Sequence, residues 1–257
     1  MMARDAVATV AAIKGLLAAE THAVLAGWDL SRGKSENLRD SPALRACGSE
    51  RLAVQRAKAL SSRLEIPGRD APLVALARRG WPPEHWKPPL LWHLAEGDRL
   101  IRWFLEEWLF PRRGAEPLNA RDLRPAIVAL RGAPPLGADT VEHVAGALFK
   151  IAVDADLMTG SVSRRFRPFR LSDPALLYML HALAERHAAA RRIIEAPDWR
   201  RFLMTPAEVE HELFRLHQFR VLDYQVAGSL AQLTLPRASL ADFAEGWEPW
   251  TGTGAKD

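Results

Sequence analysis

The sequence contains little cysteine and little lysine. Cys47 is the only cysteine among 257 residues, so the chain can form no disulfide within itself and no zinc site built on several cysteines. This cysteine usage is typical of a reducing compartment, and we expect a cytoplasmic protein. Lysine supplies six of the 35 basic residues and arginine the other 29, so guanidinium groups carry most of the positive charge.

The sequence also lacks an apolar run long enough to cross a membrane. The most apolar stretch, over residues 6–27, is interrupted by Lys14, Glu20 and His22. A spanning helix needs about 20 apolar residues with few charges. Asp5 at the start of the stretch also sets it apart from a signal peptide. We therefore expect no membrane partner.

No catalytic or metal-binding motif is recognisable. His211 and His217 are six residues apart, whereas a zinc protease helix spaces its two histidines by four so that both reach one metal. A glycine-rich phosphate loop, a nucleophile elbow and a Cys–His pair are missing as well. We therefore expect no enzyme, no metal and no cofactor, and a nuclease or hydrolase is the least favoured alternative.

Composition and periodicity predict a mainly α protein. Hydrophobic residues make up 48% of the chain, enough for a proper core. Apolar residues at helical spacing predict helices over residues 5–27, 50–65, 70–79, 89–110, 122–131, 139–158, 173–194 and 206–218. Residues 31–48 are polar and are expected to be irregular. Strands over 219–226 and 229–235 predict a small C-terminal β-hairpin, and a second ribbon is expected over 161–171.

Capping residues mark the starts of three of these helices. Ser49, Asp139 and Thr205 are suited to accept hydrogen bonds from exposed backbone amides. Glu142 and Glu208 lie three residues after two of them, as in a capping box.

Residues 111–117 combine proline, glycine and charge with no apolar anchor, which is typical of a linker. We expect an N-terminal helical domain over 1–111, a C-terminal helical, winged-helix-like domain over 118–250 and a disordered tail over 251–257. Helix, turn, helix and basic ribbon follow one another in the second domain, in the order of a winged-helix module. A single α-solenoid is the alternative.

The densest basic segment spans residues 161–170. It holds four arginines, Arg164, Arg165, Arg167 and Arg170, with two aromatic residues and no acid. Arginine presents a rigid fork of donors that fits phosphate oxygens. The segment therefore indicates a contact with a nucleic-acid backbone. A solvated surface, or docking on an acidic partner protein, is the alternative interpretation.

Two further basic groups accompany this loop. Arg51 and Lys58 lie on one flank of the predicted helix 50–65, and Arg56 and Arg63 lie on the other. They form a second candidate phosphate-facing surface, or else extend around a buried apolar stripe. Lys150 lies on the outward face of the predicted helix 139–158. That face is poor in the residues that read base edges, so we expect DNA binding with little sequence specificity.

The order of several short segments resembles the BrxA family, small accessory proteins of BREX phage-exclusion systems. The resemblance covers most of residues 13–245. Its segments are Gly27-Trp28-Asp29, Glu36-Asn37-Leu38, Arg63-Leu64-Glu65, residues 90–94 with 104–107, residues 139–145 with 148–149 and 156–158, and residues 199–203. The resemblance implies a mostly helical, two-part, non-enzymatic protein that binds double-stranded DNA. It also implies partners within a larger defence assembly that contains a methyltransferase.

Two functions from different classes are therefore expected. The first is a double-stranded DNA-binding accessory protein of phage defence that contacts the phosphate backbone. The second is a protein–protein adaptor that scaffolds a defence complex through the tryptophan-rich helix 89–110 without contacting DNA.

Overall fold

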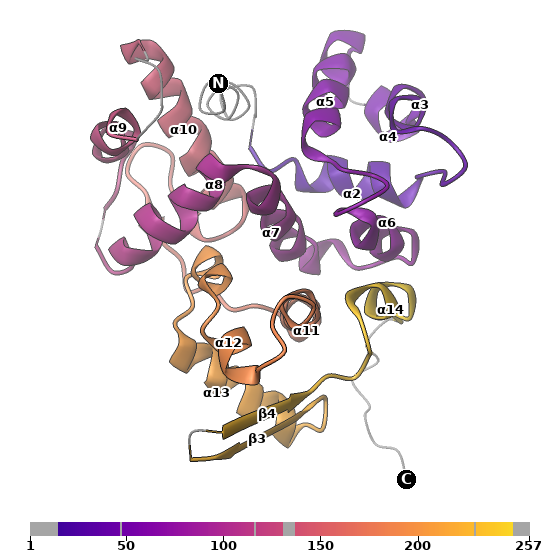
Figure 1. Cartoon of the computed structure of the whole chain (residues 1–257). Coiled ribbons are helices and arrows are strands. Elements are labelled where there is room, and N and C mark those ends of the chain that lie inside the picture. Colours follow the sequence, from indigo (N-terminus) through magenta and orange to yellow (C-terminus); the bar gives the residue numbers. More distant parts are fainter. Residues whose placement is uncertain (1–14, 47, 116, 131–136, 229, 249–257) are drawn as a thin grey trace.

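A computed structural model describes residues 15–46, 48–115, 117–130, 137–228 and 230–248. The chain is mainly helical, as the sequence predicts, with two small antiparallel two-stranded sheets in its second half. Figure 1 shows the helices of the first half, with α10, above those of the last third of the chain. Within the described residues no helix has the length and apolar character needed to cross a bilayer.

The helices of the first half are short. They are α2 (Ala18–Ala26), α3 (Lys34–Asp40), α4 (Pro42–Arg45), α5 (Glu50–Arg63), α6 (Ala71–Arg78), α7 (Lys87–Gly97) and α8 (Arg99–Trp103), with a 3₁₀ turn, η1 (Pro83–His85). The expectation of an irregular segment over 31–48 was wrong, because α3 and α4 occupy much of it. The described part of the expected helix 5–27 begins only at Ala18, since Gly15 and Leu17 have φ of 92° and 54°. Residues 5–14 lie outside the described residues.

The expected helix 89–110 is interrupted at Asp98. The Asp98 carboxylate accepts hydrogen bonds from the amides of Leu100 and Ile101, at 2.9 and 3.1 Å, and so starts α8 as an N-cap. The chain continues as a π-helical segment, η2 (Phe104–Leu109), and a 3₁₀ turn, η3 (Phe110–Arg112). The periodicity of the apolar residues predicts one helix over 89–110, but the cap at Asp98 divides it into separate elements.

The second half carries the sheets. Its elements are α9 (Ala120–Val128), α10 (Ala138–Asp154), β1 (Met158–Thr159), β2 (Arg165–Phe166), α11 (Asp173–Ala184), α12 (Ala190–Ile194), η4 (Pro197–Phe202), α13 (Pro206–Gln218), β3 (Asp223–Ala227), β4 (Leu230–Thr234) and α14 (Leu240–Glu245). The predicted C-terminal hairpin is confirmed, with Tyr224 opposite Leu233. The predicted cap at Asp139 is wrong, because Gly137 precedes the first turn of α10.

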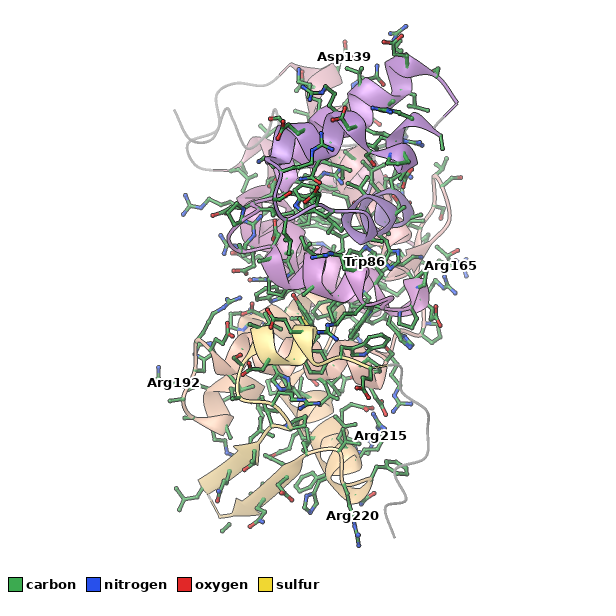
Figure 2. All side chains as sticks on the ribbon, turned by 90° about the vertical axis from the view of Figure 1, so that its right-hand side faces the viewer. Trp86, Asp139, Arg165, Arg192, Arg215 and Arg220 are labelled. Atoms are coloured by element: carbon green, nitrogen blue, oxygen red, sulfur yellow. The ribbon has the colours of Figure 1, made fainter. Side chains whose placement is uncertain are left out.

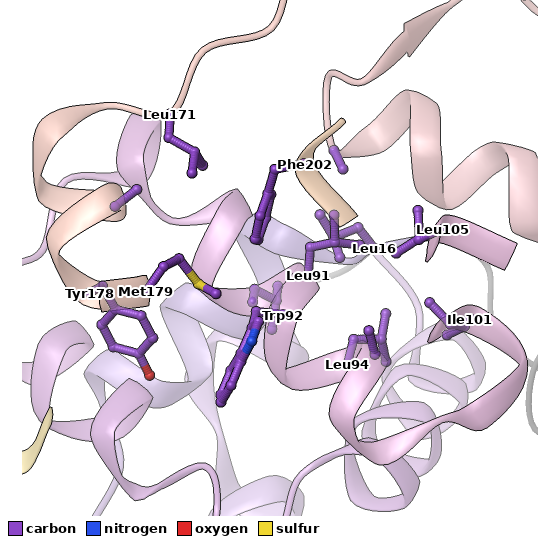
Figure 3. Close-up of a cluster of buried hydrophobic side chains, with 14 of the residues drawn as sticks. Leu16, Leu91, Trp92, Leu94, Ile101, Leu105, Leu171, Tyr178, Met179 and Phe202 are labelled. Atoms are coloured by element: carbon purple, nitrogen blue, oxygen red, sulfur yellow. The ribbon is translucent and has the colours of Figure 1, made fainter. Parts of the chain in front are cut away.

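Buried side chains from both halves form one continuous cluster. Figure 3 shows Leu91 and Trp92 of α7 in this cluster, together with Tyr178 and Met179 of α11 and Phe202 of η4. The cluster also includes the buried residues Val141, Val144, Leu148 and Ile151 of α10. The domain boundary at 111–117 stays a prediction, and the two segments it would separate share this core.

A buried guanidinium joins the two halves. Arg201 of η4 is 2% exposed and contacts three carboxylates: Glu106 at 2.6 Å, Glu96 at 2.7 Å and Asp198 at 3.2 Å. Trp92 donates its indole N–H to Asp198 at 3.0 Å. Because a charge without partners is costly in the interior, these contacts fix α7, η2 and η4 relative to one another.

A second buried polar group lies between α6, α7 and α11. His93 Nδ1 lies 2.6 Å from Asp70 Oδ1, and its Nε2 lies 2.5 Å from the Tyr178 hydroxyl. Burial would raise the pKa of Asp70, but the hydrogen bonds from His93 and Arg69 outweigh it and lower that pKa to about 2. Burial lowers the pKa of His93, so the imidazole is neutral and has a partner on each nitrogen.

The N-cap of α13 is the one that the sequence predicts. Thr205 Oγ1 accepts from the Glu208 amide at 3.3 Å, and Glu208 Oε2 accepts from the Thr205 amide at 2.8 Å. We expect Thr205→Ala to lower the free energy of unfolding by about 1 kcal/mol, because one helix amide loses its acceptor. Denaturant titration measures the change. An unaltered midpoint would show that the hydroxyl does not stabilise α13.

Buried histidines predict a loss of stability in mild acid. Burial lowers the pKa of His93 and of His181 below the 6.5 of an unfolded histidine. Below that pH the unfolded chain binds more protons than the folded chain, so stability is full above about pH 6.5 and falls as the pH drops toward the folded pKa values. Melting temperature should therefore fall between neutral pH and about pH 5, and less steeply in His181→Gln. A flat profile would contradict this.

Candidate nucleic-acid interface

The arginine loop is a short hairpin fixed at both ends. Thr159 pairs with Arg165, and Met158 pairs with Phe166, so the strands start earlier than the expected 161–171 ribbon. Gly160 makes the turn with φ of 97°, and a Cβ there would lie 2.3 Å from a backbone oxygen. Arg164 also exchanges two backbone hydrogen bonds with Leu118, at 2.8 and 2.9 Å. The loop is thereby held against the segment that precedes α9.

Arg165 of β2 and Arg164, which precedes the strand, have different surroundings. Arg165 is exposed and has no side-chain hydrogen bond or ion pair among the described residues. Figure 2 shows it at the edge of the molecule, on the opposite side of the view from Arg192. The Arg164 guanidinium lies 4.6 Å from the Phe149 ring centroid, and burial lowers its pKa. Arg165 is therefore the arginine of this pair that is free to meet a phosphate.

The other two loop arginines have carboxylate partners. Arg167 donates to Asp156 at 3.1 Å, and Arg170 donates to Glu212 at 3.2 and 3.3 Å. Glu212 is shared, because Arg215 also donates to it at 2.7 Å. All these arginines are at least partly exposed, and exposed ion pairs of this kind are weak. A phosphate could therefore compete for Arg167 and Arg170.

Alternating arginine and aromatic side chains lie behind the hairpin. Arg112 of η3 lies 4.4 Å from the centroid of the Trp108 ring. Trp108 meets Phe149 edge to face with ring centroids 5.6 Å apart, and Arg164 lies over the Phe149 ring. Cation–aromatic contacts contribute about 0.5–2 kcal/mol each. Sequence reasoning missed Arg112 as a neighbour of the loop, since no local spacing links η3 to residue 164.

Lys150 and Arg63 converge on one stretch of backbone. Arg63 donates to the carbonyls of Gly15 and Leu16 at 2.7 and 3.1 Å, and burial lowers its pKa to about 10. Asp154 accepts from the Leu16 amide at 2.9 Å and pairs with Lys150 at 2.9 Å. The structure thus brings two predicted site residues together, but both contribute to holding the chain at Gly15 and Leu16.

The remaining basic residues of α5 divide in the same way. Arg56 pairs with Glu20 of α2 at 3.0 Å. Arg51 and Lys58 are exposed and make no ion pair with a described residue. The second candidate surface therefore consists of these two free cations, with Arg56 partly engaged and Arg63 turned to the interior.

Two other kinds of site, a metal centre and a proton relay, have little support among the described residues. The residues that the structure describes contain no group of three or more His, Cys, Asp or Glu side chains able to hold a metal. Asp70, His93 and Tyr178 have the hydrogen-bond order of a proton relay, but the Tyr178 side chain is closed from solvent. We interpret this trio as a structural element of the core.

Comparison with known proteins adds no relative. No protein-family model, no curated protein and no solved structure matches the chain.

Proposed function

We propose that this chain is a non-enzymatic accessory protein of a BREX-type phage defence system that binds double-stranded DNA. In this proposal it contacts the phosphate backbone with little sequence specificity, and its other partners are BREX proteins such as the methyltransferase. The BREX context rests on the resemblance to the BrxA family. The DNA contact rests on the arginine hairpin.

The observation that supports DNA binding best is the exposed guanidinium of Arg165, which has no partner in the described part of the chain. It stands on a strand whose backbone is fixed by β1 and by Leu118, so little backbone freedom is lost when it meets a phosphate. Arg164, beside it, is held in place by Phe149. Arginine on a fixed backbone suits recognition of the duplex backbone rather than of base edges.

Low sequence specificity follows from the helix beside the hairpin. The exposed face of α10 carries Thr140, His143 and Lys150, and Lys150 is paired with Asp154. A helix that reads bases usually presents arginine, asparagine or glutamine to the major groove. Affinity in this proposal therefore comes mainly from charge and depends on salt.

A protein–protein adaptor is the second candidate. Most of the tryptophan surface expected to serve it is buried, because Trp92 and Trp108 are 5% and 2% exposed and Trp103 is partly buried. Exposed apolar side chains instead occur near the C-terminal hairpin, where Phe219 and Leu230 are 69% and 75% exposed. Large exposed apolar side chains are one feature of surfaces that meet a protein partner.

Salt dependence of DNA affinity tests the first candidate. Each phosphate that an arginine neutralises releases counterions, so the logarithm of affinity falls with the logarithm of salt at about 0.9 per contact. Replacing the four loop arginines by alanine should weaken binding to every duplex alike and flatten this slope by roughly three, because Arg164 is engaged by Phe149. Replacement by lysine should restore the charge but only part of the affinity. Fluorescence anisotropy with unrelated duplexes measures both.

A charge-matched control separates the hairpin from the rest of the surface. Arg192 of α12 is exposed and, like Arg165, has no side-chain partner among the described residues. Arg165→Ala should flatten the slope by about one unit, and Arg192→Ala should leave it unchanged. Equal effects of the two variants would remove the hairpin as the contact surface. Failure of the wild-type protein to shift any duplex at low salt would replace DNA binding by the adaptor.

A further inference from the structure

A cavity of about 280 Å³ opens beside the arginine hairpin, between the start of α7, the end of α10 and the start of α11. Lys87 lines it from the start of α7, and Arg167 and Arg170 line it from the loop between β2 and α11. Two carboxylates, Glu84 and Asp156, line it as well. The cavity therefore brings Lys87 to two arginines that lie far from it in the sequence.

The Asp156 carboxylate already lies between two of these cations. Its Oδ2 accepts from Lys87 Nζ at 2.6 Å, and its Oδ1 accepts from Arg167 Nη1 at 3.1 Å. An oxyanion with one oxygen on each of two cations has the arrangement that a phosphate adopts between a lysine and an arginine. Asp156 shows by its own contacts that this position accepts an anion.

The backbone at Asp156 is one that glycine or asparagine favours. The amide of Leu157 donates to the Ala152 carbonyl and the amide of Asp156 to the Val153 carbonyl, both at 3.0 Å, which closes α10 with a Schellman motif. Asp156 occupies the left-handed position of this motif with φ of 62°. Neither glycine nor asparagine would supply the negative charge that the two cations receive here.

Two further polar side chains of the cavity, Ser172 and Arg170, could bind an anion. The buried Ser172 hydroxyl, at the N-cap of α11, has no hydrogen-bond partner among the described residues. Arg170 is 60% exposed, and among the residues that the structure describes its only ion-pair partner is Glu212, which Arg215 also engages. A phosphate that entered would meet an unused hydroxyl donor and a third cation in addition to the pair that Asp156 holds.

We propose that this cavity binds one phosphate of the DNA backbone, which displaces the Asp156 carboxylate from Lys87 and Arg167. The inference rests on the proposed function and names a phosphate site for it. Asp156 acts as an internal competitor: it keeps the two cations in place when no DNA is bound and lowers the affinity of the site. No bond is made or broken, since one oxyanion replaces another.

Asp156→Asn tests the competition. Asparagine tolerates the left-handed backbone, so the variant should fold, but its amide cannot neutralise Lys87 and Arg167. Duplex affinity measured by fluorescence anisotropy should rise about threefold to tenfold. The gain should vanish when Lys87→Gln and Arg167→Gln are present, because the freed cations are its cause. Asp223→Asn on β3 removes the same charge from a side chain that is 71% exposed, and serves as the control.

Outcomes separate this inference from the proposed function. A gain in Asp156→Asn that exceeds that of Asp223→Asn and needs both cations supports the site. Duplex binding by the wild type with equal effects of the two asparagine variants overturns the site and leaves DNA binding standing. If neither wild type nor Asp156→Asn binds duplex, the proposed function fails and the backbone-phosphate site fails with it. Titration with inorganic phosphate in the calorimeter then shows whether the cavity takes free phosphate instead.

Discussion

The guanidinium of Arg201 must have carboxylate partners in a part of the molecule that water does not reach. Glu96 and Glu106 provide them from α7 and η2, so both elements are held against η4. The π-helical segment that carries Glu106 also carries Trp108. Trp108 packs on Phe149, and Arg164 lies over the Phe149 ring. The position of the arginine hairpin therefore depends on the charge of Arg201, which is buried between the two halves of the molecule.

Much of the basic character of this protein is neutralised within the protein itself. Arg167 and Arg170 have carboxylate partners, Arg63 binds backbone carbonyls, and Lys150 pairs with Asp154. The net charge of +4 therefore does not show which cations are available to a partner, and Arg165 is one that has no partner among the described residues. Binding that draws on the paired arginines exchanges one anion for another, which suits an interaction that is weak, reversible and sensitive to salt.

The features that could be predicted from the sequence depend on residues that are close together in it. The Thr205 cap and the hairpin of β3 and β4 depend on neighbours within a few residues, and both were predicted. The break at Asp98 was not, because a capping carboxylate inside an apolar repeat has no distinct pattern. The candidate site was found only as a cluster of arginines. That Lys87 shares a carboxylate with one of them depends on long-range packing of α7 against the end of α10, which periodicity does not encode.

Glu208 serves two structures with one carboxylate. It closes the capping box of α13 and also receives two hydrogen bonds from Arg113, a residue of the segment between the two halves, both at 2.6 Å. Its side chain is 41% exposed, which would ordinarily mark a position free to vary. A replacement here must satisfy a helix amide and a guanidinium at once, and no compensating change at Arg113 restores the amide's acceptor. Glu208 is thus under two independent constraints, so its tolerance to substitution should resemble that of a buried residue.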